Sequence, residues 1–257
     1  MQPDSTKRFS NRVDNYARFR PGYPSALIGI LEKETGCSSA SVIADIGSGT
    51  GISAKMFLEH GCTVYAVEPN DEMRKAAESQ LNDFPGFHSV AGRAEATTLD
   101  SQSVDVVVAA QAFHWFDRPA TKREFRRILR PGGWVVLMWN TRRIQSTPFQ
   151  RDYEAMLQRF GTDYERVKHM NVGEADLQEF LGPFRKFILL NGQTLDFEEL
   201  KGRLLSSSYV PAEGDPNYEP MLRALKGLFE QYRENGRVCM DYDTEIYLGN
   251  RNTMEGT

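Results

Sequence analysis

A short apolar run that ends in alternating glycines constrains this chain more than any other feature of its sequence. The run reads Val42-Ile43-Ala44-Asp45-Ile46, and its length and apolar character predict a buried parallel strand. The loop that follows it consists of Gly47, Ser48, Gly49, Thr50 and Gly51. Glycine adopts positive φ and lets the backbone approach a ligand closely. The sequence therefore predicts a ligand-binding loop at the carboxyl end of a strand.

Strand and helix patterns alternate after this loop. We expect further strands at 63–68, 87–91, 104–110 and 134–139, with helices at 52–59, 71–82 and about 118–129 between them. Beyond residue 140 we expect a polar helical stretch at about 146–180, a strand at 184–190, helices at about 196–207 and 217–234, and a final strand at 238–248. Strands separated by helix-sized segments indicate right-handed βαβ units. The predicted fold is α/β, with a doubly wound, mostly parallel, seven-stranded sheet.

No repeat or low-complexity linker divides the chain, so we predict a single domain over residues 1–257. Its expected parts are an N-terminal arm and cap at 1–35 that includes a helix from about 24 to 35, a ligand-binding core at 36–140, and helical lid segments with the last two strands at 141–257. The arm carries aromatic and arginine side chains, among them Tyr16 and Arg20. Two interpretations of the arm stay open, a lid that closes over the ligand or a structural wrap on the sheet.

Charge and cysteine content narrow the class of partner. The formal net charge of −4 disfavours a protein that tracks nucleic-acid phosphates. Three widely spaced cysteines, Cys37, Cys62 and Cys239, predict neither a disulfide framework nor a metal site. No signal peptide or membrane-spanning run is recognisable. We expect a cytoplasmic monomer or homodimer that acts on a small molecule and binds neither nucleic acid nor membrane.

The residue before the glycine loop separates two candidate ligands. Gly49 to Ala54 formally fits the G-x-G-x-x-A pattern of a dinucleotide site. Asp45, however, comes two residues before the first glycine, where a carboxylate would repel a pyrophosphate. The same carboxylate suits the ammonium group of S-adenosylmethionine as a charge-assisted partner. A plain cap of the loop backbone is the alternative role for Asp45.

A second carboxylate, Glu68, ends the second expected strand and is followed by Pro69. There it is placed to accept hydrogen bonds from both ribose hydroxyls of an adenosine. This residue does not separate the two cofactors, but it requires a ribose without a phosphate. A surface glutamate before a proline turn is the alternative.

These motifs resemble those of class I S-adenosylmethionine-dependent methyltransferases. The matching runs are Val42 to Gly51, Glu68 to Met73, Gly92 to Glu95, Ser103 to Val108 and Leu129 to Trp134, and they occur in the family's order over roughly residues 5–140. Gln111 to Asp117 and Tyr16 to Pro24 resemble the small-molecule group that includes trans-aconitate methyltransferase. The resemblance implies a Rossmann-like methyltransferase fold with S-adenosylmethionine as cofactor and no metal.

The resemblance also implies the remaining cofactor contacts. They are Tyr16, Arg20, Pro69, Met73, Arg93, Ala94, Glu95, Gln111 and Ala112. One position departs from the family, because Arg93 stands where an acidic residue often accepts the adenine amino group, and arginine cannot accept a hydrogen bond. Either Glu95 takes that role, or Arg93 flanks the ring while the backbone of Ala94 reads its edge.

His114 follows the fourth expected strand and is the candidate catalytic residue. An imidazole with a pKa near ~6.5 suits a general base. A structural histidine is the alternative. The lid segments carry Arg142, Arg143, Tyr153, Tyr164, His169, Tyr209 and Tyr218, which are either contacts for a carboxylate acceptor or surface residues.

The predicted function is transfer of a methyl group from S-adenosylmethionine to a small molecule by direct in-line displacement, with a carboxylate or a hydroxyl group as acceptor. Alignment of the reacting atoms supplies most of the catalysis in such a reaction. Two other classes stay open, a nicotinamide-dependent oxidoreductase and a non-catalytic adenosylmethionine-binding regulator.

Overall fold

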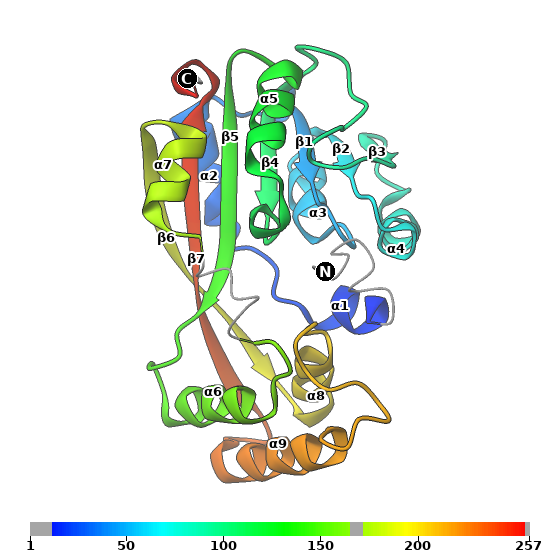
Figure 1. Cartoon of the computed structure of the whole chain (residues 1–257), viewed down its shortest axis with the longest axis vertical. Helices are drawn as coiled ribbons and strands as arrows, with labels where there is room; N and C mark the ends of the chain where they lie inside the picture. Colours follow the sequence, from blue (N-terminus) through cyan, green and yellow to red (C-terminus); the bar gives the residue numbers. More distant parts are fainter. Residues whose placement is uncertain (1–11, 165–171, 255–257) are drawn as a thin grey trace.

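The computed structural model of the protein describes residues 12–164 and 172–254. Its centre is a seven-stranded sheet in the order β3-β2-β1-β4-β5-β7-β6. The strands are β1 (Val42–Ile46), β2 (Thr63–Val67), β3 (Phe87–Val90), β4 (Val104–Ala110), β5 (Leu129–Arg142), β6 (Phe184–Leu195) and β7 (Val238–Asn250). β7 runs antiparallel to both of its neighbours. This topology confirms the predicted α/β fold class (Figure 1).

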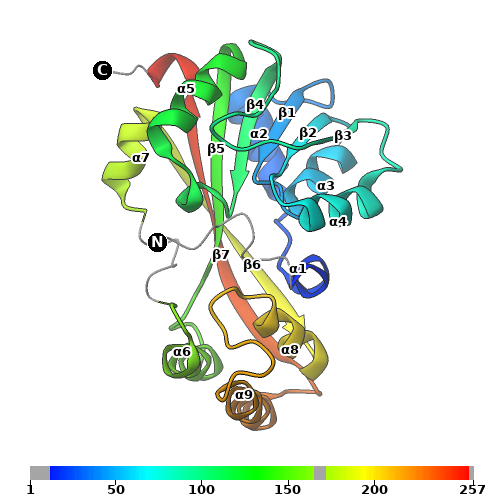
Figure 2. The same cartoon turned by 45° about the vertical axis from the view of Figure 1, so that its right-hand side comes forward.

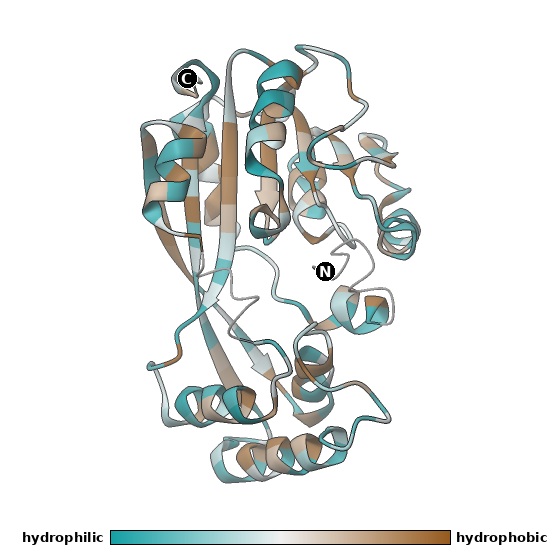
Figure 3. Cartoon of the chain, in the orientation of Figure 1, coloured by the Kyte–Doolittle hydropathy of each residue, from teal (hydrophilic) through white to brown (hydrophobic). Residues whose placement is uncertain are grey.

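Helices cover both faces of the sheet. They are α2 (Ala26–Thr35), α3 (Ile52–Glu59), α4 (Asp71–Leu81), α5 (Arg118–Ile128) and α7 (Glu174–Leu181). The first three bury their apolar side chains on one face and the last two on the other. The apolar strands lie between helices whose outer surfaces are hydrophilic (Figure 3). No helix of the described residues is long and apolar enough to cross a membrane.

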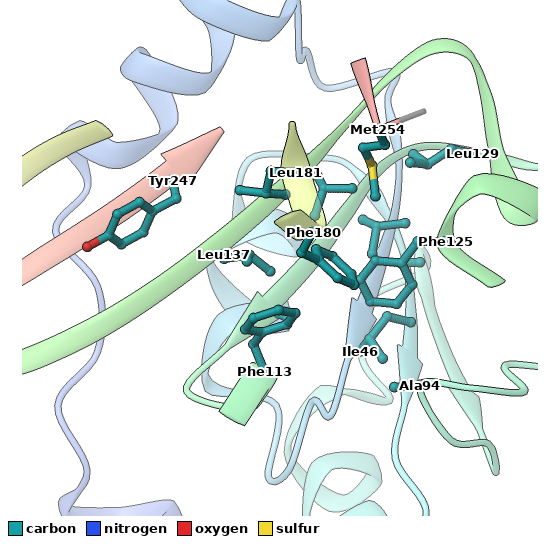
Figure 4. Close-up of a cluster of buried hydrophobic side chains, with 14 of the residues drawn as sticks. Ile46, Ala94, Phe113, Phe125, Leu129, Leu137, Phe180, Leu181, Tyr247 and Met254 are labelled. Atoms are coloured by element: carbon teal, nitrogen blue, oxygen red, sulfur yellow. The ribbon is translucent and has the colours of Figure 1, made fainter. Parts of the chain in front are cut away.

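Aromatic side chains fill the face under α5 and α7. Phe180 of α7 contacts Phe113, with ring centroids 4.6 Å apart, and Phe125 of α5, at 5.8 Å. Figure 4 shows these three rings packed together beside Ile46 and Leu137. Phe113 comes directly after β4, in a short 3-10 turn (η2, Phe113–Trp115). The packing of Phe113 in this core therefore fixes the position of the turn that carries His114.

The last three strands of the sheet are longer than the sequence predicted. β5 continues to Arg142 and β6 to Leu195, whereas apolar patterns placed their ends near 139 and 190. β5 also begins earlier, at Leu129, so Pro131-Gly132-Gly133 lies within it at a register shift instead of before it. The segments added at the carboxyl ends of β5 and β6 are largely polar, and they pair with β7, so hydrophobicity gave no signal for them.

These extensions carry a separate group of helices, which we call the lid region. It comprises α6 (Pro148–Phe160), α8 (Phe197–Leu205) and α9 (Tyr218–Tyr232), packed on the far ends of β5, β6 and β7 (Figures 1 and 2). Along the first half of β7, even-numbered residues from Val238 to Thr244 are buried and odd-numbered ones are more exposed. The period-two pattern predicted for this strand is thereby confirmed.

The N-terminal arm contains one short helix, α1 (Val13–Phe19), which lies between the carboxyl ends of the strands and α8 (Figure 2). The guanidinium of Arg12 donates to the carbonyls of Leu205, Ser207 and Val210 at 2.7–3.0 Å. The ring of Phe19 packs on Gly202 of α8, where a Cβ would lie 2.2 Å from it. The arm is therefore fixed to the lid region, and its residues 1–11 lie outside the described part.

The packing of Phe19 on Gly202 gives a test of this docking. We expect Gly202→Ala to loosen α1, because the new methyl group has no space beneath the ring. Amide hydrogen exchange of residues 13–19 should then accelerate.

Gly227 of α9 is the matched control, since nothing lies within 4 Å of its Cβ position. Gly227→Ala should stabilise the protein by about 0.5–1 kcal/mol through helix propensity alone. Equal exchange of residues 13–19 in both variants and the wild type would contradict the docking of Phe19.

Candidate active site

Two adjoining cavities open at the carboxyl ends of the parallel strands. The first, of about 160 Å³, we call the glycine-loop cavity. Its lining comprises Tyr16, Gly47, Gly49, Glu68, Pro69, Asn70, Met73, Arg93, Ala94, Glu95, Ala110, Gln111, Ala112, Trp115 and Phe116. The second, of about 280 Å³, extends from the same strand ends into the lid region, and we call it the arginine cavity. Ligands bind at this edge of doubly wound sheets.

The three loop glycines have different physical roles. All three have positive φ, between 57° and 85°. A Cβ on Gly47 would meet Ala112 at 2.7 Å, and one on Gly51 would meet Leu81 at 2.5 Å, so these two glycines permit close packing. A Cβ on Gly49 would find only Tyr16, at 4.0 Å. Gly49 therefore leaves open space in the cavity, where a ligand can approach the backbone.

Asp45 lies at the end of β1 and is fully buried beneath the loop. Its Oδ2 accepts a hydrogen bond from Ser53 Oγ at 2.6 Å, while the buried Oδ1 has no partner among the described residues. Burial raises the pKa of Asp45 to about 7, although the bond from Ser53 opposes this shift. The side chain does not line either cavity, so its contact with an ammonium group stays a prediction.

The raised pKa of Asp45 makes a stability test possible. The folded protein holds this proton up to about pH 7, whereas an unfolded chain releases it near pH 4, so stability is lost as pH rises through that window. At pH 8 we expect Asp45→Asn to unfold at a higher temperature than the wild type, because its free energy of unfolding is larger by on the order of 1 kcal/mol or more. At pH 4 the two proteins should unfold at the same temperature.

The same variant should bind S-adenosylhomocysteine at least ~10-fold more weakly in calorimetry, because it lacks a charge-assisted partner for the ammonium group. Higher stability together with wild-type affinity would show that the carboxylate lies outside the binding site.

Glu68 follows β2 and lines the glycine-loop cavity. Its Oε2 accepts from the Gly49 backbone N–H at 2.9 Å, and its Oε1 accepts from that of Asn70 at 2.8 Å. Burial raises the pKa of the carboxyl, and these two backbone bonds oppose the shift. Each oxygen of a carboxylate has a second lone pair, so both remain able to accept from a ribose diol.

Glu68→Gln should weaken S-adenosylhomocysteine binding about 30-fold, or ~2 kcal/mol, because an amide replaces a charged double acceptor. Glu72→Gln, an exposed residue of the next helix, is the control that loses the same charge. Calorimetric dissociation constants measure both. A Glu68→Gln variant that binds like Glu72→Gln would remove Glu68 from the site.

The residues expected around adenine converge on this cavity. Pro69, Met73, Arg93 and Ala94 all line it, and Met73 is also largely buried. Glu95 lines it too, but its Oε1 accepts from the backbone N–H of Asp117 at 2.9 Å, where α5 begins. This bond occupies part of the acceptor capacity of Glu95. The contacts of Arg93 and Glu95 with adenine stay predictions.

The turn after β4 forms the wall between the cavities. Gln111 has a φ of 58°, which is strained for a residue with a side chain, and its backbone N–H donates to the Met138 carbonyl at 2.9 Å. Ala112 lines the glycine-loop cavity, whereas His114 lines the arginine cavity. The ring of His114 lies 4.7 Å from that of Trp115, which lines both cavities.

The other predicted site residues divide into two groups. Tyr16 lines both cavities, while Arg20 and Ser48 line the arginine cavity. Thr50 and Gly51 line neither, because Thr50 is buried and Gly51 packs against α4. The described residues include no group of three or more His, Cys, Asp or Glu side chains that could hold a metal ion.

The rest of the arginine cavity is supplied by the end of β5, by α6 and α8 and by the segments that follow these two helices. Of the lid residues singled out from the sequence, Arg142, Tyr164 and Tyr209 line it, whereas Tyr153 and Tyr218 do not. Arg143 is exposed and pairs with Asp243, and His169 falls outside the described residues. Sequence reasoning missed Arg203, Glu154 and Asn140, which line this cavity from α8, α6 and β5. The one sequence signal for Arg203 and Glu154 is that each lies on the apolar face of its helix, where a charged residue is unexpected.

Comparison with known proteins identifies the class. Residues 44–137 match the family described as a methyltransferase domain. An uncharacterized methyltransferase of Mycobacterium bovis is 39% identical over 139 residues, which are 54% of this chain and 54% of that protein. An uncharacterized methyltransferase-like protein of Schizosaccharomyces pombe is 29% identical over 94% of each chain. A solved structure from Anaeromyxobacter dehalogenans, described as a type II methyltransferase, aligns with a TM-score of 0.68 at 25% identity over 91% of this chain and 98% of that chain.

Residues 44–137 match a methyltransferase domain, and the strand order is that of the Rossmann-like fold of S-adenosylmethionine-dependent methyltransferases. The matched segment spans about half the length of the Mycobacterium relative. The predicted trans-aconitate methyltransferase-like group is not assigned by these relatives and stays a prediction. The residues present fit the cofactor. The open position at Gly49 and the Glu68 carboxylate line the glycine-loop cavity, and the unsatisfied Asp45 oxygen lies beneath the loop.

Proposed function

We propose that this protein transfers a methyl group from S-adenosylmethionine to an oxygen atom of a small acidic molecule held in the arginine cavity. When bound, S-adenosylmethionine supplies an electrophilic methyl group on a sulfonium. One observation carries the proposal: the two cavities share a wall made by Tyr16, Gly47, Gly49, Ala110, Gln111 and Trp115. A cofactor in one cavity and an acceptor in the other therefore meet at the end of β4.

The chain's own residues supply mainly position and exclusion of water. The glycine loop and Glu68 hold the adenosine side, and the turn at Gln111 fixes the boundary where the reacting atoms meet. Tyr16 of the arm lines both cavities. Holding two reactants in a near-attack geometry is worth ~7–11 kcal/mol of the barrier. No nucleophilic side chain is required, because the acceptor itself attacks.

Charge in the arginine cavity favours an acceptor oxygen that is already ionised. Arg20, Arg142 and Arg203 line it, and Glu154 is the only acidic residue among its described lining. An excess of positive charge stabilises the deprotonated form of an acidic group. A carboxylate acceptor therefore fits better than a neutral hydroxyl, and no proton has to be removed from it.

The role of His114 follows from this choice. We expect His114→Gln to keep turnover within ~10-fold of the wild type with an unshifted pH profile, because an ionised acceptor needs no general base. A loss on the order of 10²–10⁴, with an acidic limb that disappears in the variant, would instead indicate a hydroxyl acceptor and His114 as its base. Thermal unfolding of both proteins separates either result from a loss of stability.

The direct test is a transfer assay with methyl-labelled S-adenosylmethionine and a panel of small carboxylic acids and alcohols. We expect label in ester products of acids and little in ethers. Binding of the cofactor without transfer to any acceptor would favour the non-catalytic regulator. Binding of a nicotinamide dinucleotide in its place would favour the oxidoreductase.

A further inference from the structure

The arginine cavity contains more positive charge than its protein partners balance. The guanidinium of Arg142 pairs with Glu154 at 2.7 Å and donates to the hydroxyls of Tyr164 and Tyr209. Arg20 and Arg203 have no carboxylate partner among the described residues. Three guanidinium groups against one carboxylate leave two positive charges in the same cavity.

The partners of these two arginines are neutral. Arg20 donates to the carbonyl of Ser206 at 3.0 Å, and its guanidinium lies 4.8 Å from the ring centroid of Tyr16. Arg203 is almost fully buried and donates to the hydroxyls of Tyr242, at 3.2 Å, and Ser207, at 3.3 Å. Buried charges are normally paired, so two that are not indicate a site for an anion.

The pKa of Tyr209 reflects the combined charge of the three arginines near its hydroxyl group. Burial alone would raise the pKa of its phenol, but Arg142, Arg203 and Arg20 together lower it to about 8. Burial, and after it the charge of Arg203, lower the pKa of the Arg20 guanidinium. These residues come from β5, from α8 with the loop after it, and from the arm, so their convergence is a property of the tertiary structure.

We propose that Arg20, in place of the cofactor contact predicted for it from the sequence, forms with Arg203 an anion-binding subsite for a second acidic group of the acceptor. This group is a carboxylate or a phosphate that is not methylated, and an anion there fixes the arm over the cofactor. This inference rests on the proposed function for the identity of the acceptor. Guanidinium groups suit both kinds of anion, because their planar donor arrays match carboxylate and phosphate oxygens.

The coupling to the cofactor passes through Tyr16. Its ring lies under the Arg20 guanidinium, and its Cε1 lies 4.0 Å from the Cβ position of Gly49. An anion shared by Arg20 on the arm and Arg203 on α8 relieves the repulsion between them and holds Tyr16 against the glycine-loop cavity. By linkage, the anion and the cofactor should each raise the other's affinity by the same factor.

The experiment titrates the whole chain with S-adenosylhomocysteine in a calorimeter, alone and in the presence of succinate, of inorganic phosphate, or of neutral succinamide at matched ionic strength. We expect succinate or phosphate, but not succinamide, to raise the S-adenosylhomocysteine affinity about 5-fold or more. An effect of succinate alone assigns a carboxylate to the subsite, and an effect of phosphate alone assigns a phosphate group. No effect of either anion overturns the coupling.

Variants locate the effect. Arg20→Gln and Arg203→Met should each weaken direct binding of the effective anion at least ~10-fold and abolish its influence on S-adenosylhomocysteine. Arg143→Gln, which removes an exposed charge on the same strand end as Arg142, should behave as the wild type. Equal weakening in Arg20→Gln and Arg143→Gln would overturn the subsite, and thermal unfolding checks whether the Arg203 variant is folded.

Failure of this inference differs from failure of the proposed function. Titration of the anion into the protein without S-adenosylhomocysteine tests the subsite alone, whatever the reaction is. If the anion binds at Arg20 and Arg203 but labelled methyl groups are never transferred, the proposed function is wrong and the subsite stands. If transfer occurs to acids that carry no second anionic group as efficiently as to those that do, the subsite is not an acceptor anchor.

Discussion

The side-chain amide of Asn140 joins the last two strands of the sheet to the N-terminal arm. Its Oδ1 accepts from Thr244 Oγ1 of β7 at 2.6 Å and from Asn191 Nδ2 of β6 at 3.1 Å. Its Nδ2 donates to the carbonyl of Gly22 in the arm at 3.0 Å. Asn140 stands where β5 leaves the apolar core, so this network fixes both the lid-region strands and the arm relative to the sheet.

The extension of β5, β6 and β7 beyond the core has a direct consequence for the site. A sheet that ended where its apolar residues end would provide no support for the helices that line the arginine cavity. Continuing the antiparallel ladder instead supports α6 and α8, which bring Glu154 and Arg203 to within reach of residues from the arm. Ladder hydrogen bonds make these extensions rigid without requiring an apolar sequence.

Several groups in the site are arranged at a cost to stability. Asp45 is buried with one unsatisfied oxygen, Gln111 adopts a positive φ, and Arg20 and Arg203 lack opposite charges among the described residues. Each such feature costs on the order of 1–3 kcal/mol in a protein that gains nothing else from it. Their gathering around two adjoining cavities is the pattern expected of ligand-binding positions.

The sequence alone determined the sheet from β1 to β5, because short apolar runs separated by amphipathic helices permit few alternatives. It also determined the glycine loop and the place of Glu68 after β2, since a ligand loop after a strand requires glycines. The burial of Asp45 beneath this loop was decided by the tertiary structure. Tertiary structure alone decided the arginine cavity. Arg20, Arg142 and Arg203 are far apart in the chain, and their polar surroundings carry no periodic signal. Only the ladder of β5 with β7 and the docking of α1 on α8 bring their charges together, because burial and charge density depend on which surfaces meet in space.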